Sequence, residues 1–162
     1  MKEILKKIQL VSRNRTTHQV GLLQAKVYRI LKQETNRHLA PAGLTTLHWA
    51  FLGLLFVHSK GLRLQVVAQE LGVEPPFVTE LAKELVKKEL VVIEKDVTDS
   101  RAKVAMLSKS GTVFVKKTEA HMRECMRPMI SGVSPADLIT YLTVLEKIVT
   151  NAHNTKKEKN YE

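Results

Sequence analysis

Apolar positions along most of the chain repeat at helical spacing. From about Thr17 to Asn36, and again from Ser134 to about His153, apolar residues recur with the period of an amphipathic helix. A shorter stretch of the same kind covers residues 4–11. The segment from Thr45 or Thr46 to about His58 is apolar on nearly all sides, which predicts a helix buried in the middle of the fold.

Two short helices in close succession are predicted after this central helix. The first covers residues 64–71 and ends at Gly72, a residue that suits the left-handed conformation of a helix end. Pro75–Pro76 fits the first turn of the second helix, where a missing N–H costs little. The second helix runs to about Lys88. The inward-facing positions of the pair are Val67, Ala68, Leu71, Val78, Leu81, Ala82 and Leu85.

A β-hairpin is predicted to follow. Residues 90–93 and 104–107 are β-branched or apolar runs on either side of the charged tip 96–103. Ser108 then begins a long helix to about Met129. Helix, turn, helix and hairpin in this order is the plan of a winged helix-turn-helix, which places a helix in the DNA major groove.

The predicted fold is mainly α with a small β-hairpin wing. Residues 45–111 form the winged helix-turn-helix, and residues 155–162 form a polar tail. A wing domain of this kind does not need the helices in residues 1–44 and 112–154, and their apolar stripes are too wide for one chain to cover. We expect these helices to form a homodimer, since a twofold dimer places two recognition helices about one DNA turn apart.

Composition narrows the function classes. The chain of 162 residues has a formal charge of +10 and a pI of about 9.8, which favours an anionic partner. Cys125 is the single cysteine, so no intramolecular disulfide is possible. The N-terminus lacks the apolar core of a secretion signal, and the longest apolar run, around Trp49–Val57, is too short to span a membrane. We expect a cytoplasmic protein that does not contact membranes.

The positive charge is uneven along the chain. Residues 1–37 carry nine lysines and arginines against two acids, whereas residues 38–111 carry nine against eight. The predicted DNA-binding motif is therefore almost neutral. Either its own cations suffice for the DNA phosphates, or the N-terminal helices flank the DNA, or the N-terminal charges form a solvated helix face.

The ordered set of motifs in the chain resembles the MarR (multiple antibiotic resistance regulator) family of transcriptional regulators. The likeness covers roughly residues 24–152. It rests on Leu44-Thr45 with His48-Trp49, Ala68-x-x-Leu71-Gly72-Val73, Val78-Thr79-x-Leu81, Leu85-x-Lys87-Lys88-x-Leu90-Val91, Asp96-x-x-Asp99-x-Arg101-Ala102, Leu107-Ser108-x-x-Gly111 and Ser134-x-x-Asp137-Leu138. The resemblance implies a homodimer that binds a palindromic promoter site in double-stranded DNA, usually as a repressor. It also implies release from DNA by a small phenolic or lipophilic effector.

The resemblance assigns roles to particular residues. Arg101 matches the wing arginine that enters the minor groove, and Asp99 matches the aspartate that supports it. The recognition helix corresponds to residues 75–88. On its outer face, hydroxyl, carboxylate and ammonium groups can contact bases or phosphates. The complete set of expected DNA-binding residues is Thr79, Glu80, Lys83, Lys87, Asp99, Arg101 and Lys103.

The chain also departs from the family pattern. Glu74, Phe77 and Glu80 stand where the family tends to have Ser, Thr or Arg, and Glu89 replaces a usual glycine. Phe77 is equally consistent with contact to a thymine methyl and with partial burial. These acids favour an alternative function, in which a winged-helix protein has weak or lost specific DNA binding and acts through protein contacts.

Other chemistry has little support in the sequence. The chain has no phosphate-binding glycine loop, HExxH motif or nucleophile elbow, so we do not expect an enzyme. Its six histidines are scattered, and we expect neither a metal site nor a cofactor. Cys125 is interpreted as core filling. His48 and Trp49 either line an effector pocket or pack in the core.

Overall fold

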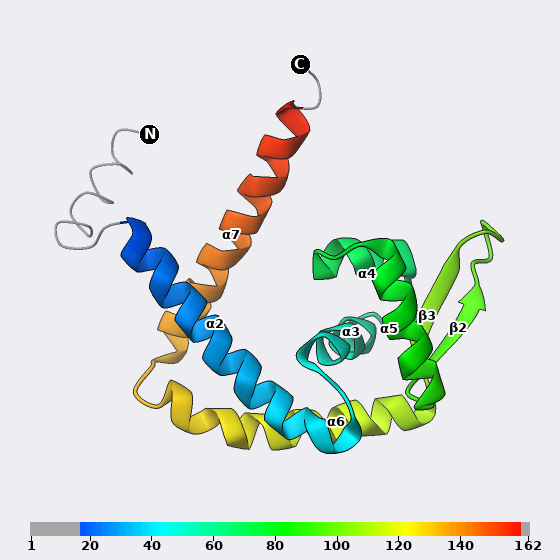
Figure 1. Ribbon diagram of the computed structural model, residues 1–162, viewed down its shortest axis with the longest axis horizontal. Helices are drawn as coiled ribbons and strands as arrows, with labels where there is room; N and C mark the ends of the chain where they lie inside the picture. The colour runs from blue at the N-terminus through cyan, green and yellow to red at the C-terminus, as the bar shows by residue number, and fades with distance from the viewer. Residues whose placement is uncertain (1–16, 160–162) are drawn as a thin grey trace. The chain divides into compact units, whose positions relative to one another are not determined.

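The computed structural model describes residues 17–159, and their contacts divide the chain into two compact units, Met1–Met122 and Arg123–Glu162. Each unit is described by itself. The elements follow one another in the order shown in Figure 1. They are α2 (Thr17–Leu39), the 3-10 turn η1 (Ala40–Ala42), α3 (Thr46–Val57), β1 (Leu62–Arg63), α4 (Leu64–Leu71), α5 (Pro75–Lys87), β2 (Val91–Lys95), β3 (Lys103–Leu107), α6 (Lys109–Met126), the 3-10 turn η2 (Arg127–Ile130) and α7 (Pro135–Lys159).

The fold is mainly helical with a small antiparallel wing, as the sequence predicts. The predicted bounds of α3, α4 and α5 agree with the structure to within about a residue. α7 is longer than predicted, and the helix expected over residues 4–11 lies outside the described residues. The helix expected from Ser108 to Met129 instead ends at Met126 and continues as η2, because Pro128 cannot donate the backbone hydrogen bond that an α-helix needs.

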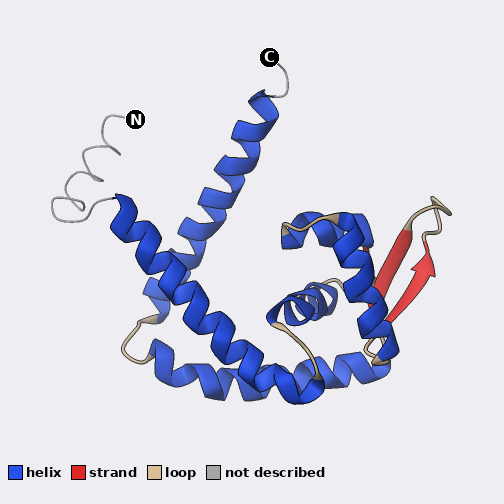
Figure 2. Cartoon of the chain, viewed as in Figure 1, coloured by secondary structure: helices blue, strands red, loops and turns tan. Residues whose placement is uncertain are grey.

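The wing has three strands, whereas the sequence predicts two. The order in the sheet is β1-β3-β2, and all pairings are antiparallel. β1 consists of only Leu62 and Arg63, which pair with Ala105 and Val104, so its pattern is too short to recognise in the sequence. Figure 2 shows the β2–β3 hairpin extending away from the helices with its tip uncovered.

The core lies among α3, α4, α5 and the inner face of the sheet. All the predicted inward positions of α4 and α5 are buried, except that Leu71 is half-buried. In α3, Phe51, Leu52 and Leu55 are buried as expected, but Phe56 and Val57 at its end are exposed. Helix α3 is therefore central, but its last turn faces outward.

The backbone at the end of α5 shows why a glycine is usual at the position that Glu89 occupies here. The amide of Glu89 donates to the Val86 carbonyl at 2.9 Å, and the amide of Leu90 donates to the Leu85 carbonyl at 3.0 Å. This hydrogen-bond pair is a Schellman motif, whose turning residue normally is glycine. Glu89 takes the left-handed conformation with φ 58°, which costs a residue with a Cβ about 1–2 kcal/mol.

The Leu107-Ser108-x-x-Gly111 motif joins the wing to α6. The Ser108 hydroxyl accepts from the Gly111 amide at 2.8 Å and donates to the Glu89 carbonyl at 2.6 Å, so it caps the new helix and fixes it to the end of α5. A Cβ on Gly111 would overlap the Leu90 carbonyl oxygen. Glycine is therefore required where α6 passes the chain leading into β2.

The second unit contains the last turn of α6, η2 and α7. Ser134 caps α7, since its hydroxyl accepts from the Asp137 amide at 3.1 Å and donates to the Asp137 carboxylate at 2.6 Å. The Ser134-x-x-Asp137 motif therefore forms a helix cap. Apolar side chains along α7 are exposed in the isolated chain, among them Ile139, Leu142, Ile148 and Val149.

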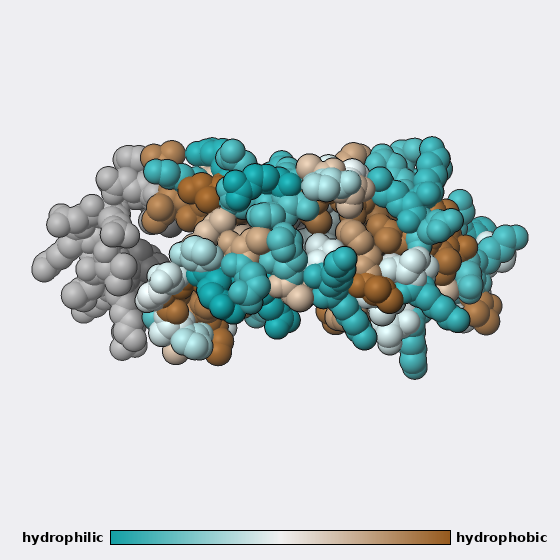
Figure 3. Space-filling view, turned by 90° about the horizontal axis from the view of Figure 1, so that it is seen from below, coloured by the Kyte–Doolittle hydropathy of each residue, from teal (hydrophilic) through white to brown (hydrophobic). Residues whose placement is uncertain are grey.

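Helix α2 in the first unit also presents apolar side chains to solvent. Leu22, Leu23, Tyr28 and Ile30 are all exposed. On the face drawn in Figure 3, apolar patches interrupt the hydrophilic surface. Wide apolar patches of this kind usually mark an interaction surface.

Among the described helices, none by itself is long and apolar enough to cross a membrane. Residues 21–42 and 46–57 have the required length and composition only when taken together, and the chain bends by 83° between them.

Candidate nucleic-acid interface

Helix α5 presents a mixed polar face. Glu80, Lys83 and Lys87 are exposed, while Thr79 is half-buried. The Lys83 ammonium lies 2.7 Å from a Glu80 carboxylate oxygen, and the Thr79 hydroxyl donates to the Pro75 carbonyl at 3.1 Å. Lys83 and Glu80 therefore offset each other's charge in the isolated chain, and a DNA phosphate would compete with Glu80 for the Lys83 ammonium.

The side chains at the N-terminal end of α5 offer few groups that would bind DNA. Glu74 precedes the helix and its side chain makes no capping bond, and Phe77 is 49% exposed. Partial burial of Phe77 in the isolated chain leaves half of its ring available to a partner. This end of the helix carries no cation, in agreement with the departures seen in the sequence.

The wing tip holds Arg101 in an exposed position. The Asp99 carboxylate accepts from the Arg101 backbone amide at 3.0 Å and from its guanidinium Nε at 3.2 Å. The Arg101 side chain is 91% exposed. The Nε contact restricts the arginine, while its side chain stays almost fully accessible to a partner. Sequence reasoning paired these two residues, and the structure shows how they meet.

A second arginine, which sequence reasoning missed, fixes the base of the wing tip. Arg63 donates from Nε and Nη2 to the two carboxylate oxygens of Asp96, at 2.8 and 2.9 Å, and from Nη2 to the Thr98 hydroxyl at 2.8 Å. Asp96 also accepts from the amides of Thr98 and Asp99 at 2.8 and 3.0 Å. A bidentate arginine–carboxylate pair has a defined geometry, so the start of α4 orients the wing loop.

These contacts change the protonation equilibria of both partners. The hydrogen bonds from Arg63, and then those from Thr98, hold the pKa of the Asp96 carboxyl well below its usual range. The Asp96 carboxylate in turn raises the pKa of Arg63. Both groups are therefore charged at neutral pH, and the loop is held by a charge-assisted network.

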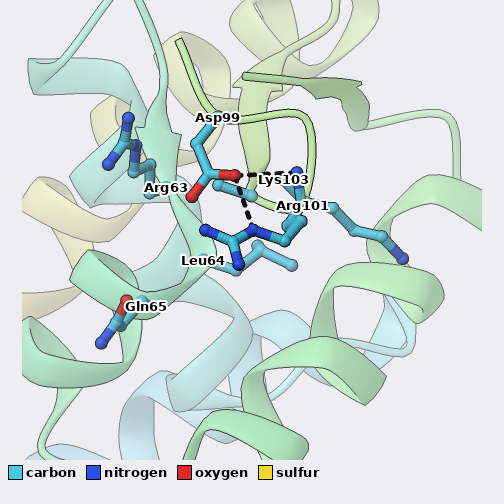
Figure 4. Close-up of a pocket in the computed structure, with 7 residues that line it drawn as sticks. Arg63, Leu64, Gln65, Asp99, Arg101 and Lys103 are labelled. Atoms are coloured by element: carbon cyan, nitrogen blue, oxygen red, sulfur yellow. Dashed lines mark hydrogen bonds and ion pairs between the residues drawn. The ribbon is translucent and has the colours of Figure 1, made fainter. Parts of the chain in front are cut away.

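A hollow of about 280 Å³ lies between the wing and the start of α4 (Figure 4). Three of its lining side chains are cationic, namely Arg63, Arg101 and Lys103, and one is acidic, Asp99. Gln65 and Leu64 complete the α4 side. Figure 4 shows the Asp99 carboxylate beside the Arg101 guanidinium, with a dashed line joining them. The excess of cations makes the hollow suitable for an anion.

His48 and Trp49, the expected effector residues, do not line this hollow. His48 is 4% exposed, and its Nε2 lies 3.1 Å from the Glu84 carboxylate of α5. Its Nδ1 accepts from the Thr45 amide at 3.1 Å, which completes a capping box at the start of α3. Trp49 is half-buried against the core. Both residues thus have packing roles in the isolated chain.

Part of the chain that contains most of the described site matches the model of a known protein family. Residues 42–102 match the model of the MarR family. The structure is similar to that of a MarR-family transcriptional regulator from Rhodococcus sp. RHA1, with a TM-score of 0.75 and 21% identity over 83% of this chain and 95% of the other. The matched residues contain α3, α4, α5, β2 and the wing tip as far as Ala102.

Two further similar structures contain ligands. One is CouR from Rhodococcus jostii RHA1 bound to p-coumaroyl-CoA, with a TM-score of 0.73 and 22% identity over 80% of this chain and 90% of the other. The other is the S. aureus MepR–DNA complex, with a TM-score of 0.69 and 23% identity over 81% and 96%.

Proposed function

We propose that this chain is a winged-helix DNA-binding transcriptional regulator of the MarR family, whose model matches residues 42–102, and that it acts as a homodimeric repressor on a palindromic operator. A small phenolic or lipophilic effector would release it from DNA. The observation that carries the proposal is the wing tip, where Asp99 holds an almost fully exposed Arg101 beside a cationic hollow. Narrow minor grooves attract an arginine presented in this way.

The hollow supports phosphate binding next to the inserted arginine. Arg63 and Lys103 lie on its two sides, and phosphate contacts supply much of the affinity of a DNA-binding protein. Arg63 keeps its bidentate contact with Asp96 while it contributes positive charge. We therefore add Arg63 to the expected contact set.

In this proposal, α5 contributes less to sequence reading than the wing. The exposed face of α5 pairs Lys83 with Glu80, and no cation stands at its N-terminal end. In the major groove, Lys83 and Lys87 would contact phosphates and Thr79 a base or phosphate. Glu80 would accept a hydrogen bond from cytosine N4, which disfavours other bases at that position.

The exposed apolar side chains of α2 and α7 support a homodimer. Both helices expose large apolar residues that a stable monomer in water would bury. A twofold axis then relates two wings and two α5 helices, and this matches a palindrome with half-sites about one helical turn apart. Such a protein acts on DNA in the cytoplasm.

Effector release would act through the spacing of the two α5 helices. His48 connects α3 to Glu84 of α5, so a ligand that moves α3 in one subunit would move the recognition helix with it. Spectroscopic distance measurement between labels on the two α5 helices tests this version. It predicts a changed spacing with a ligand that relieves DNA binding, and an identical spacing rules it out.

The alternative function is a winged-helix protein that binds other proteins and not a specific DNA site. Glu74, Glu80 and Glu84, all exposed on or beside α5, favour it. Selection of the full-length chain on random duplex DNA separates the two functions. Enrichment of a palindrome of about 16–20 base pairs supports the operator-binding dimer, and no enrichment at low salt supports the alternative.

A further inference from the structure

Phe77 is a large apolar residue held in a fixed place at the start of α5. It lies in the first turn of the helix and is 49% exposed. Its backbone amide donates to the Glu74 carbonyl at 3.0 Å, and its neighbour Val78 is fully buried in the core. The helix and the core therefore position Phe77, while half of the residue stays accessible. Aromatic side chains presented in this way contribute strongly to interfaces.

The polar groups around Phe77 offer little to a DNA base. Residues 74–79, all of which the structure describes, include no cationic side chain. Pro75 and Pro76 have no backbone N–H, and the Thr79 hydroxyl donates its proton to the Pro75 carbonyl at 3.1 Å. The N-terminal residues of a recognition helix are the ones that contact base edges. At this end of α5, the accessible uncharged chemistry is therefore mainly apolar.

One base presents an apolar group in the major groove. This group is the 5-methyl of thymine, and phenylalanine is among the side chains that contact it. We infer that Phe77 contacts the 5-methyl group of one thymine in each operator half-site, an inference that rests on the proposed DNA binding. The contact favours a base pair that contains thymine over guanine–cytosine pairs, which carry no methyl group at this edge.

Glu80 sets where this thymine lies. It follows Phe77 by three residues, so the two side chains are neighbours on the surface of α5, with Cβ atoms about 5–6 Å apart. Successive bases along a strand are separated by about 3.4 Å. Since Glu80 is assigned to a cytosine N4, the thymine lies about one or two base-pair steps from that cytosine. An isolated surface phenylalanine, or one that binds a protein, predicts no dependence on a DNA methyl group.

Replacement of thymine by deoxyuridine tests the contact, because uracil lacks the 5-methyl group and keeps the same hydrogen-bonding edge. The full chain is titrated with the palindrome obtained by selection, and with duplexes in which each thymine of the half-site is replaced in turn, symmetrically. Replacement at the contacted position should weaken binding roughly fourfold for each half-site, the equivalent of one methyl group. In Phe77→Ala, the same replacement should leave the affinity unchanged, since the interacting partner is gone.

Val86→Ala is the matched control. Val86 is 41% exposed on the same helix, but it follows Phe77 by nine residues, or about two and a half turns, and so lies on the opposite side of α5. This variant should keep the full loss of affinity on replacement by deoxyuridine. Each comparison uses two duplexes with one protein preparation, so a lower folded fraction of a variant does not alter the ratio.

The outcomes separate this contact from operator binding itself. The contact is contradicted if no replacement weakens binding, if Phe77→Ala keeps the full loss, or if the selected half-site contains no thymine. In these cases the palindrome is still bound, so the proposed function stands and Phe77 is left to a protein partner. Failure of the selection to enrich any palindrome overturns both the contact and the proposed function.

Discussion

Nε2 of the buried His48 lies 3.1 Å from a carboxylate oxygen of Glu84, and this contact joins the first turn of α3 to the middle of α5. Nδ1 of the same ring accepts from the Thr45 amide. The neutral ring therefore carries its proton on Nε2 and donates it to Glu84. One histidine thus caps the central helix and positions the helix that faces DNA.

Removal of Glu84 should destabilise the protein more than its surface position suggests. Glu84→Ala leaves the buried Nε2–H of His48 without this acceptor, which should cost about 1–3 kcal/mol of unfolding free energy. Glu80→Ala on the same helix is the matched control, since Glu80 forms an exposed ion pair with Lys83, and such pairs contribute at most about 1 kcal/mol. Urea unfolding at neutral pH measures both, and equal losses would show that the His48 contact contributes nothing.

Glycine at position 89 should be tolerated or stabilising. Glu89 has φ 58°, and glycine would relieve a strain of about 1–2 kcal/mol at an entropic cost of about 0.5–1 kcal/mol in the unfolded chain. We expect Glu89→Gly to change the unfolding free energy by between zero and about 1.5 kcal/mol in the stabilising direction. By contrast, Glu80→Gly inside α5 should destabilise by about 1 kcal/mol. Thermal unfolding of the two variants compares them directly, and a destabilised Glu89→Gly would contradict the strain argument.

Asp96→Asn should weaken DNA binding, although it removes a negative charge. Asparagine can offer Arg63 only one acceptor oxygen, so the bidentate contact and the wing-tip turn are lost. We expect a several-fold loss of affinity at constant salt. If charge alone mattered, the variant would bind phosphates more tightly, so tighter binding would contradict the positioning role of Asp96.

The same contact gives the wing a pH dependence whose sign follows from the lowered pKa of Asp96. A depressed native pKa means that the stabilisation is fully present above the unfolded value of about 3.9. It is lost as the pH falls below that value towards the native pKa. NMR shifts of the Thr98 and Asp99 amides, which both donate to Asp96, should titrate below pH 3.9.

Arg101→Ala should weaken operator binding by roughly 5- to 150-fold, which corresponds to about 1–3 kcal/mol. Its thermal stability should be nearly unchanged, because the side chain is 91% exposed. Arg127→Ala is the control, since Arg127 is also exposed and pairs with an acid, Glu124, outside the matched residues 42–102. Equal affinity of the Arg101 variant and the wild type would remove the wing from the interface.

The helices were predictable because their signals are local. Periodicity, Gly72 and the Pro75–Pro76 pair determine α4 and α5, and the same pattern identified their buried faces. β1 was not predictable, since two residues carry no pattern and become a strand only through pairing with β3. Likewise, η2 appears where Pro128 interrupts a helical pattern that the sequence alone extends to Met129.

The site was predictable only where its residues are neighbours in the chain. Asp99 and Arg101 lie two residues apart, and their contact follows from the motif. Arg63 lies 33 residues before Asp96. This pair forms only when the chain folds, so its role needed the structure. The position of Arg63 directly before the first helix of the motif is a sequence signal that could have drawn attention to it.

The most direct test of the central claim is the affinity of the full chain for the palindrome obtained by selection, compared with a scrambled duplex of equal length and composition at the same near-physiological salt. Specific DNA-binding proteins favour their sites by at least about 10³-fold. A palindromic dimer therefore predicts a ratio of that order, with two chains per duplex in the complex. A ratio near one, or a single chain per duplex, would contradict the proposed function.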